Sequence, residues 1–465
     1  MSHQILKLLS LAVACLYVTG CQTYKKQSSK AIGHWNSGQI DLAVTEFAKQ
    51  AEKNHDTKDH IVWHMEHATA LRANDQIVES TLAFEKAEVK IDEYEAKAKV
   101  SISREAGATM SNQANLPYKG RAYDKIMLNT YKALNYWEQG EYEKVRTEIF
   151  RAYRRQQDAV EENKKAIEKA QQEEKESKEA EKIEKARENE QFAATLDGMD
   201  QSLAHLKPYG DYVNPFTVFV DGLFFQHQPA DRADLERARK SFENLKTFSP
   251  ENTYVESEIA QIEQKIEGAN LEPTTYVIFE TGSAPSRDQI RIDIPIIIAK
   301  VSYVGAAFPK LKFHDNFHRH LKVQAGGQTA ETLIVASMDT IVGNAFRKEL
   351  PVIITKTMIS TIVKAAAAYA INEGVGNGMA GLISKIGTAV AQAAVNIADL
   401  RTWTTLPKEF QYCRVVTPVD GNIRVSTPDG LHTVDVPVLE GSSNIIYVRS
   451  VNQTSPIIVN HFNLL

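Results

Sequence analysis

Cysteine is scarce in this sequence, with three among 465 residues. Two of the three, Cys15 and Cys21, lie close to the N-terminus, so Cys413 is the only one in the remainder of the chain. A chain with one cysteine beyond its N-terminal segment has no partner for an internal disulfide. Cys413 lies in the alternating segment EFQYCRVV, which predicts a small buried strand residue rather than a nucleophile.

A strong excess of charge of either sign is also missing. The 54 basic and 59 acidic residues give a formal net charge of −5, which offers no basic face for a nucleic acid. No G-x-S-x-G, Walker, HExxH or CxxC motif is present, so we expect no catalytic residues, no cofactor and no resident metal. A hydrolase of envelope polymers is disfavoured as well, since no pair of carboxylates lies in a suitable context.

The first 20 residues have the layout of a secretory signal. Lys7 supplies a positive charge, and the apolar core Leu8–Tyr17 is too short for a permanent membrane span. Val-Thr-Gly directly precedes Cys21 and resembles the bacterial lipobox, in which the cysteine thiol receives a diacylglyceryl group. We therefore predict a lipoprotein signal peptide over residues 1–20 and lipidation at Cys21. The alternative is an ordinary signal peptide with an incidental cysteine.

The resemblance to a lipobox implies a membrane anchor. Two or three acyl chains bind a bilayer firmly, because each buried CH₂ group contributes about 0.8 kcal/mol. Gln22 follows the cysteine where an Asp would favour retention, and this implies the outer membrane, with the chain facing the periplasm. Residues 21–30 include the polar sequence TYKKQSSK and are predicted to form a tether.

The region 31–268 has the periodicity of amphipathic helices. Four segments share a turn followed by a helix whose small and aromatic residues lie three, four or seven positions apart. They are HWNSGQIDLAVTEFAKQAEK, RANDQIVESTLAFEKAEVKI, NYWEQGEYEKVRTEIFRAYRR and ADLERARKSFENLKTFSPEN. The pattern resembles the second half of a tetratricopeptide repeat, which implies an array of helical hairpins with a concave face for partners. A non-repetitive α-bundle is the alternative.

Residues 155–195 of this region are rich in Glu, Lys and Ala. Oppositely charged side chains recur at i, i+4, and each such pair stabilises a solvated helix by about 0.2–0.5 kcal/mol. These pairs are Glu161–Lys165, Glu174–Lys178 and Glu181–Lys185. The apolar positions do not sustain a heptad, so a coiled coil is not expected. We predict a long exposed helical arm, and a docking arm that reaches into the periplasm is the alternative.

Two groups of histidines have spacings that call for comparison with metal sites. They are His60, His64 and His67, which share one helix face, and His314, His318 and His320, in a polar segment. Histidines at i and i+4 can bind zinc, yet neither group has the HExxH order. Spacing alone does not give ligand geometry. We therefore expect surface or interfacial histidines without a metal.

The pattern changes near Pro273, and the region 272–465 is predicted to form a mixed β/α domain. Its first part, TTYVIFETGSAPSRDQIRIDIPIII, holds two β-branched runs joined by a loop, which predicts paired strands. Residues 408–465 hold short alternating strands between Asp-Gly and Gly-Ser turns, typical of a sandwich or β meander. The chain is thus predicted to be α+β, a helical array followed by a domain with an antiparallel, sandwich-like C-terminal part.

Residues 352–400 contain two Ala-rich apolar helical segments joined by a Gly-rich turn. Small residues of this kind suit close helix packing in a membrane. However, Lys356, Lys364 and Lys385 interrupt the apolar runs, and a lysine in mid-membrane costs about 3 kcal/mol. We expect a core hairpin packed on the strands, and insertion into a bilayer is the alternative.

Two short motifs are the most distinctive in the chain. They are Glu280-Thr281-Gly282 with Ala284-Pro285, and Ala398-Asp399-Leu400-Arg401-Thr402-Trp403 before Leu406-Pro407. With the lipobox and the helical repeats, they resemble an uncharacterised family of bacterial lipoproteins that have tetratricopeptide-like helices and a C-terminal α/β region. The family pattern has Thr at the position of Leu400. The resemblance implies an envelope role and no assigned reaction.

Asp399, Arg401 and Trp403 are the candidate interaction residues of the second motif. An Asp and an Arg two positions apart, followed by a Trp, suit a surface recognition site. They also suit a structural role, in which Arg401 reaches the carbonyl groups at a helix end and Trp403 fixes the loop to the core. The structural role is our expectation.

These observations together predict a function outside catalysis. We expect an outer-membrane lipoprotein that acts as a scaffold, held to the membrane by its N-terminal lipid and bound to an unknown envelope protein. The alternative is a membrane-active protein that inserts the hairpin 352–400 into a bilayer.

Overall fold

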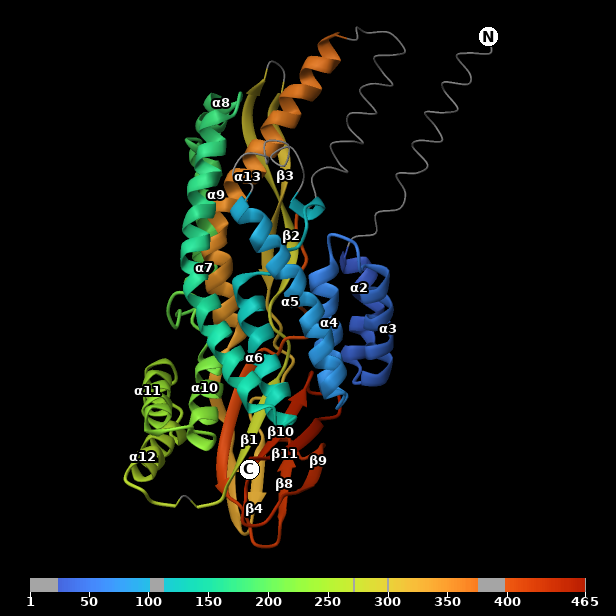
Figure 1. Ribbon diagram of the computed structural model, residues 1–465. Helices are drawn as coiled ribbons and strands as arrows, with labels where there is room; N and C mark the ends of the chain where they lie inside the picture. Colours follow the sequence, from blue (N-terminus) through green and yellow to red (C-terminus); the bar gives the residue numbers. More distant parts are fainter. Residues whose placement is uncertain (1–23, 101–112, 271, 299–300, 375–397, 465) are drawn as a thin grey trace.

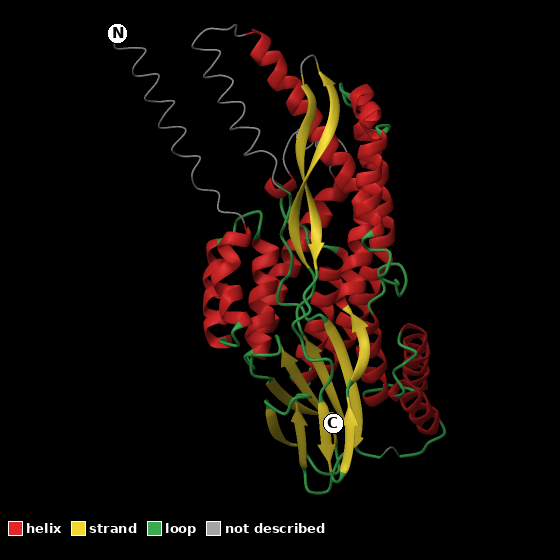
Figure 2. Ribbon diagram, turned by 180° about the vertical axis from the view of Figure 1, so that it is seen from behind, coloured by secondary structure: helices red, strands yellow, loops and turns green. Residues whose placement is uncertain are grey.

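The computed structural model describes residues 24–100, 113–270, 272–298, 301–374 and 398–464. The predicted lipidation site Cys21 lies outside these residues, as does residue range 375–397 of the predicted hairpin. The described chain is elongated, with a sheet domain at one end and a long strand hairpin that points away from it (Figure 1). Figure 2 shows the same hairpin from behind, with helices along its length.

Helices occupy the chain up to residue 268 and strands dominate after it, so the α+β prediction is confirmed. The helices of the first half are α2 (Tyr24–Asn36), α3 (Ile40–Lys53), α4 (His60–Ala73), α5 (Ile77–Val100), α6 (Ala122–Glu138), α7 (Tyr142–Glu176), α8 (Ala180–Arg187), α9 (Glu190–Gln201), α10 (Pro215–His227), α11 (Arg232–Phe248) and α12 (Tyr254–Ile266). Successive helices pack as neighbours, α2 with α3, α4 with α5, α6 with α7 and α10 with α11.

In the described residues, the second half contains the long helix α13 and the strands. They are β1 (Thr274–Thr281), β2 (Ser286–Ile298), β3 (Val301–Lys312), β4 (Lys322–Ala325), β5 (Gln328–Glu331), β6 (Leu333–Ser337), α13 (Met338–Gly374), β7 (Glu409–Val416), β8 (Asn422–Ser426), β9 (Thr433–Pro437), β10 (Ser443–Ser450) and β11 (Ile458–Leu464). A five-stranded sheet has the order β11-β10-β1-β7-β6, a four-stranded sheet has the order β5-β4-β8-β9, and β2 pairs with β3.

Strand β1 lies at the centre of the five-stranded sheet. It pairs with β10 in parallel and with β7 antiparallel. Strand β8 pairs with β4 in the other sheet instead, and β9 pairs with β8. Residues 408–465 are therefore divided between two sheets and do not form one meander, because a strand from much earlier in the chain takes the place between β7 and β10.

The side chains of β1 alternate between two hydrophobic cores. Tyr276 and Ile278 belong to a core shared with the helices, whereas Val277 and Phe279 belong to the core between the two sheets. Cys413 on β7 is buried in this second core, in keeping with its alternating segment, and burial raises the pKa of its thiol. The two sheets thus form a sandwich, and the helices cover the other face of the five-stranded sheet.

The charged helical arm does not project alone. After the long helix α7, helices α8 and α9 pack on β2, and α8 also contacts α13 (Figure 1). Ile183 and Phe192, from α8 and α9, are buried in a third core with Ile294 on β2 and with Phe346 and Met358 on α13. The arm therefore packs along the β2–β3 hairpin and helps to bury one of its faces.

The predicted tether 21–30 is wrong from Tyr24 onward, because these residues form α2. The Tyr24 ring packs 4.8 Å from the ring of Trp63, and its hydroxyl donates a hydrogen bond of 2.8 Å to Glu66. The burial of Tyr24 stabilises the packing of this segment on the fold, although most of its residues are polar. The lysines of the segment lie on the opposite, exposed face of the helix. At most residues 22 and 23 separate Cys21 from the folded chain.

The first segment of the predicted hairpin 352–400 is the C-terminal part of the longer helix α13. Within α13, Met338–Ala367 is long and apolar enough to cross a membrane by length and composition, with a mean hydropathy of 1.4. A core helix of a soluble protein has the same properties. Its apolar residues pack into the third core against β2 and β3, which is the arrangement expected of a core helix.

Candidate functional site: the junction of helices and sheet

The segment 398–407 runs between the helical array and the sheet domain and carries all three candidate interaction residues. Arg401 and Trp403 are buried, with 5% and 1% of their surfaces exposed. Asp399 is partly buried beside Arg401. Little of Arg401 or Trp403 is therefore left for a partner to contact.

Arg401 uses its guanidinium group entirely within the chain. Its Nε and Nη1 atoms pair with Asp399 Oδ1 at 2.8 Å and with Asp59 Oδ1 at 2.9 Å. Other N–H groups donate to the carbonyl oxygens of Leu116 at 2.8 Å and Gln113 at 3.2 Å. Burial opposes ionisation, but the two carboxylates outweigh it and raise the pKa of Arg401. One cation thus joins three segments that are far apart in the sequence.

Trp403 fills the space between three helices. Its Nε1–H group lies 2.9 Å from the hydroxyl of Thr69 on α4 and 3.0 Å from that of Thr405. Its ring makes edge contacts with Phe84 on α5 and Tyr131 on α6, both with centroids 5.8 Å away. A buried Trp with a satisfied N–H group is an effective anchor for a loop.

Glu66 on α4 is a junction residue that sequence reasoning missed. Its carboxylate is fully buried and accepts hydrogen bonds from the backbone N–H groups of Thr404 at 2.7 Å and Thr405 at 3.0 Å, and from the hydroxyl of Tyr24. Burial raises its pKa although these hydrogen bonds lower it. The available signal was an acidic residue in the middle of the apolar run IVWHMEHATAL.

A series of ion pairs connects the junction to α13 and the β2–β3 hairpin. Glu349 on α13 pairs with Arg121, just before α6, at 2.9 Å and with Arg287 on β2 at 2.7 Å. Arg121 also lies 4.0 Å from Asp399. Burial of Glu349 opposes its ionisation, yet the two arginines lower its pKa. The helical array, the β2–β3 hairpin and α13 are therefore tied together at one place.

The two distinctive sequence motifs are neighbours in space. The backbone N–H of Ala284 in the first donates to the carbonyl of Leu406 in the second at 2.9 Å. Gly282 has a φ angle of +70°, and a Cβ atom there would lie 2.8 Å from Cβ of Phe317 and 2.9 Å from Cβ of Lys408. Only glycine suits this close approach to Phe317 and to Lys408, which directly follows the second motif.

Glu280, from the first motif, is the centre of a buried polar group. Its Oε1 atom accepts hydrogen bonds from the hydroxyls of Tyr131 at 2.8 Å and Tyr447 at 2.5 Å, and Oε2 lies 3.6 Å from Nε of Arg449. A cavity of about 20 Å³ beside these residues, also lined by Arg72, has room for about one water molecule. This space is too small for an organic substrate.

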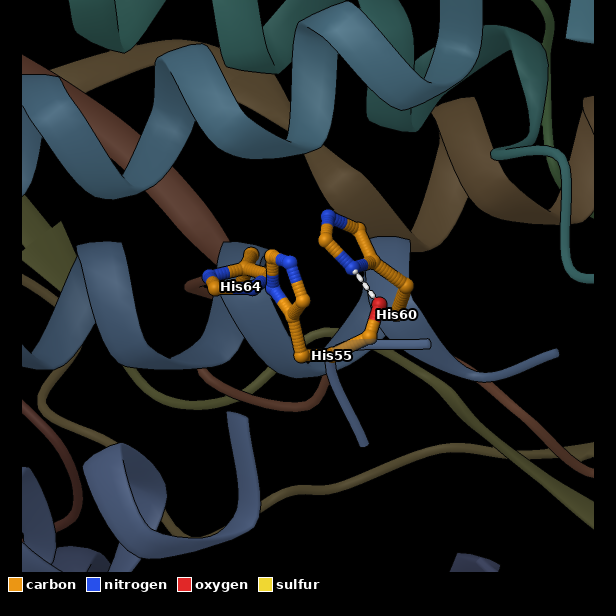
Figure 3. A group of neighbouring side chains, drawn as sticks. All are labelled: His55, His60 and His64. Atoms are coloured by element: carbon orange, nitrogen blue, oxygen red, sulfur yellow. Dashed lines mark hydrogen bonds between the residues drawn. The ribbon is translucent and has the colours of Figure 1, made fainter. Parts of the chain in front are cut away.

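The first histidine group is assembled differently from the prediction. His60 and His64 lie together on α4, but the third member of their cluster is His55, from the turn before α4, and not His67 (Figure 3). Burial, with the nearby His60 and Lys86, lowers the pKa of His64 to about 3. This cluster is the only group of three or more potential metal ligands in the described residues.

The members of the second histidine group have separate surroundings. His314 Nε2 lies 3.0 Å from the Ser286 hydroxyl, and His320 Nε2 lies 3.5 Å from Glu331 Oε1. His318 is buried. The described positions do not bring these three rings together as a metal site.

His227 at the end of α10 is a further titratable group at the sheet. Its Nε2 atom lies 3.0 Å from the hydroxyl of Tyr276, which also donates to Glu258 at 3.3 Å. Burial of the ring, with the positive charges of Lys265 and Arg414, lowers the pKa of His227 to about 3. The folded chain therefore holds this ring neutral at pH values where an exposed histidine is protonated.

Comparison with known proteins adds no relative. No protein-family model matches the chain, and neither a curated protein nor a solved structure is significantly similar to it.

Replacement of Arg401 by Ala is expected to lower the free energy of unfolding by about 3–5 kcal/mol, because it leaves Asp59 and Asp399 as partly or fully buried charges without their cation. The matched control is Arg424→Ala, which breaks an exposed pair with Asp435 and should cost about 1 kcal/mol or less. Urea denaturation followed by circular dichroism measures both values. Equal losses in the two variants would contradict the role given to Arg401.

The lowered pKa of His227 predicts a pH dependence of stability. Below about pH 6.5 the unfolded chain binds a proton that the folded ring does not bind until about pH 3, so acidification lowers stability across this window. His227→Gln is expected to reduce the slope by up to about 1.4 kcal/mol per pH unit. Denaturation midpoints between pH 4 and 7 measure the slope. The exposed control His461→Gln should leave it unchanged, and an unaltered slope in His227→Gln would refute the prediction.

Proposed function

We propose that this chain is an outer-membrane lipoprotein that acts as a non-enzymatic scaffold for another protein of the bacterial envelope. The observation that carries the proposal is the Val-Thr-Gly-Cys sequence at residues 18–21, behind a charged and then apolar segment. Acylation of Cys21 would anchor the chain, and the short motifs that resemble a lipoprotein family agree with this location.

The short separation of Tyr24, where α2 begins, from Cys21 determines how close the folded chain lies to its anchor. Three peptide units from Cys21 to Tyr24 span at most about 10 Å. Tyr24 itself is packed in the core of the helical array. A lipid at Cys21 would therefore hold the helices at the membrane surface. How far the protein extends into the periplasm would then depend on the length of the folded molecule and not on a long linker.

Helix α5 offers the surface on which a partner would be held. Val78, Leu82 and Val89 are 53–61% exposed, and their spacing of four and seven residues places them on one face of the helix. The opposite face of α5 packs on α4. Single exposed apolar residues are ordinary, but three on one helical face form a stripe of the kind that binds other proteins.

A second candidate function is insertion into a bilayer by α13. One observation favours it: the segment Met338–Ala367 has the length and composition of a membrane span. Insertion would require this helix to leave the third core, in which Leu350, Ile359 and Ile362 are buried. Dye release from lipid vesicles by the full chain separates the two functions, because a scaffold releases none.

Replacement of Cys21 by Ala is expected to abolish incorporation of labelled palmitate and to move the chain out of the outer-membrane fraction. The physical reason is the loss of the thiol that carries the diacylglyceryl group. Cys413→Ala is the matched control, since this buried thiol is not accessible to an acyl transferase and its loss should leave labelling unchanged. Labelling of Cys21→Ala at the level of the parent chain would contradict the anchor.

A photo-crosslinking residue in place of Leu82 is expected to give one discrete adduct with an envelope protein in intact cells. The same residue in place of Val419, which is 83% exposed in the sheet domain, is the control and should give no such adduct. Val78→Glu should reduce the yield at position 82, because docking would bury a charge on the same stripe. Adducts of equal yield at both positions, or none at position 82, would contradict a docking surface on α5.

A further inference from the structure

Three histidines meet where the turn after α3 enters α4. His55 lies in the turn and is exposed, while His60 and His64 occupy the first two turns of α4 and are 5% and 4% exposed. Figure 3 shows the three rings gathered at this place. The His60 and His64 ring centroids are 4.3 Å apart, and one ring nitrogen from each of the three residues lies within 4.8 Å of the other two.

His64 is the member that calls for a ligand. Both of its ring nitrogens are buried, and neither has a hydrogen-bond partner. A buried polar side chain without a partner costs free energy and is rare in folded proteins, where an ion or a water molecule often accounts for it. The neutral imidazole has one lone pair available to a cation.

His60 is held by backbone carbonyl oxygens at both of its ring nitrogens. Its Nδ1 atom lies at hydrogen-bond distance from the carbonyl oxygen of His55, and its Nε2 atom lies 3.2 Å from the carbonyl oxygen of Lys86 on α5. A neutral ring donates through one nitrogen only, so one backbone carbonyl holds the N–H group. The other nitrogen must leave its carbonyl oxygen before its lone pair can bind an ion. Histidines that bind metals commonly donate their second N–H group in this way, which fixes the ring.

We propose that His55, His60 and His64 bind a divalent transition-metal ion of the zinc type, with a position left open to solvent beside His55. Imidazole ligands favour Zn²⁺, Cu²⁺ and Ni²⁺ over Mg²⁺ and Ca²⁺. Nitrogens at 2.0–2.1 Å in a tetrahedral site are about 3.4 Å apart, so the present separation of up to 4.8 Å must contract. The exposed turn residue His55 supplies that movement, since His60 and His64 are held by α4.

The ion would join the α3–α4 turn to α4, and an open position at the surface would let it enter from solvent. It would also bind His64, whose two buried ring nitrogens have no hydrogen-bond partner. The site does not depend on the proposed scaffold function, because it is built from the fold of the helical array alone.

The test is a titration of the untagged full chain with Zn²⁺. Calorimetry and competition with a chromogenic chelator measure its stoichiometry and affinity. The parent chain is expected to bind one equivalent. His55→Ala changes an exposed residue and should fold normally, yet it should lose about 100-fold or more in affinity, since loss of even an outer partner of a ligand costs about 10–100-fold. His67→Ala, on the same helix but outside the cluster, should bind as the parent does.

A second readout is the thermal unfolding midpoint. Zn²⁺ should raise it in the parent and in His67→Ala, and should leave it unchanged in His55→Ala, because only binding to the folded chain stabilises it. Absence of stoichiometric binding by the parent would overturn the proposal. So would unchanged affinity in His55→Ala, or equal losses in His55→Ala and His67→Ala.

Discussion

The pairing of buried Arg401 with Asp59 and Asp399 is the interaction on which the arrangement of the molecule depends. A guanidinium group taken out of water is stable only while its carboxylates and carbonyl acceptors stay in place, so the segments that supply them cannot move apart cheaply. Asp59 directly precedes α4, and Asp399 belongs to the segment that leads into β7. This contact therefore fixes the sheet domain against the helices, and Trp403 and Glu66 complete the same junction with apolar area and hydrogen bonds.

This junction joins the two halves of the chain into a single structural unit. One hydrophobic core contains residues of α2 to α7, of α10 to α12 and of the five-stranded sheet, so neither half buries its apolar surface alone. The polar groups at the junction are directed at one another, and the cavity at Glu280 has room for about one water molecule. The surfaces open to a partner are therefore exposed features, the α5 stripe and the end of the chain that would face the membrane.

The sequence was most informative where a single local pattern decides the structure. Amphipathic periodicity predicted helices before residue 268, alternation predicted the strands, and side-chain chemistry predicted a structural role for Arg401 and Trp403. The prediction of a tether was wrong because Tyr24 packs on Trp63, which is distant in the sequence. The polarity of the local sequence does not reveal such a contact. The place of β1 between β7 and β10 could not be predicted for the same reason, since pairing depends on which distant strand offers a matching face. His55 joined the histidine cluster through the geometry of a turn, whereas helical spacing favoured His67.

The central claim is that the helices and the sheet domain unfold as one body. It is tested by urea unfolding of a chain with Cys15→Ser and Cys21→Ser. Tryptophan fluorescence and the reaction of the Cys413 thiol are both measured across the same transition. Trp35, Trp63 and Trp137 report on the helices, and Cys413 reports on the core between the sheets. One shared midpoint for both signals is the predicted result. Reaction of Cys413 while the tryptophan signal is still native would contradict the account.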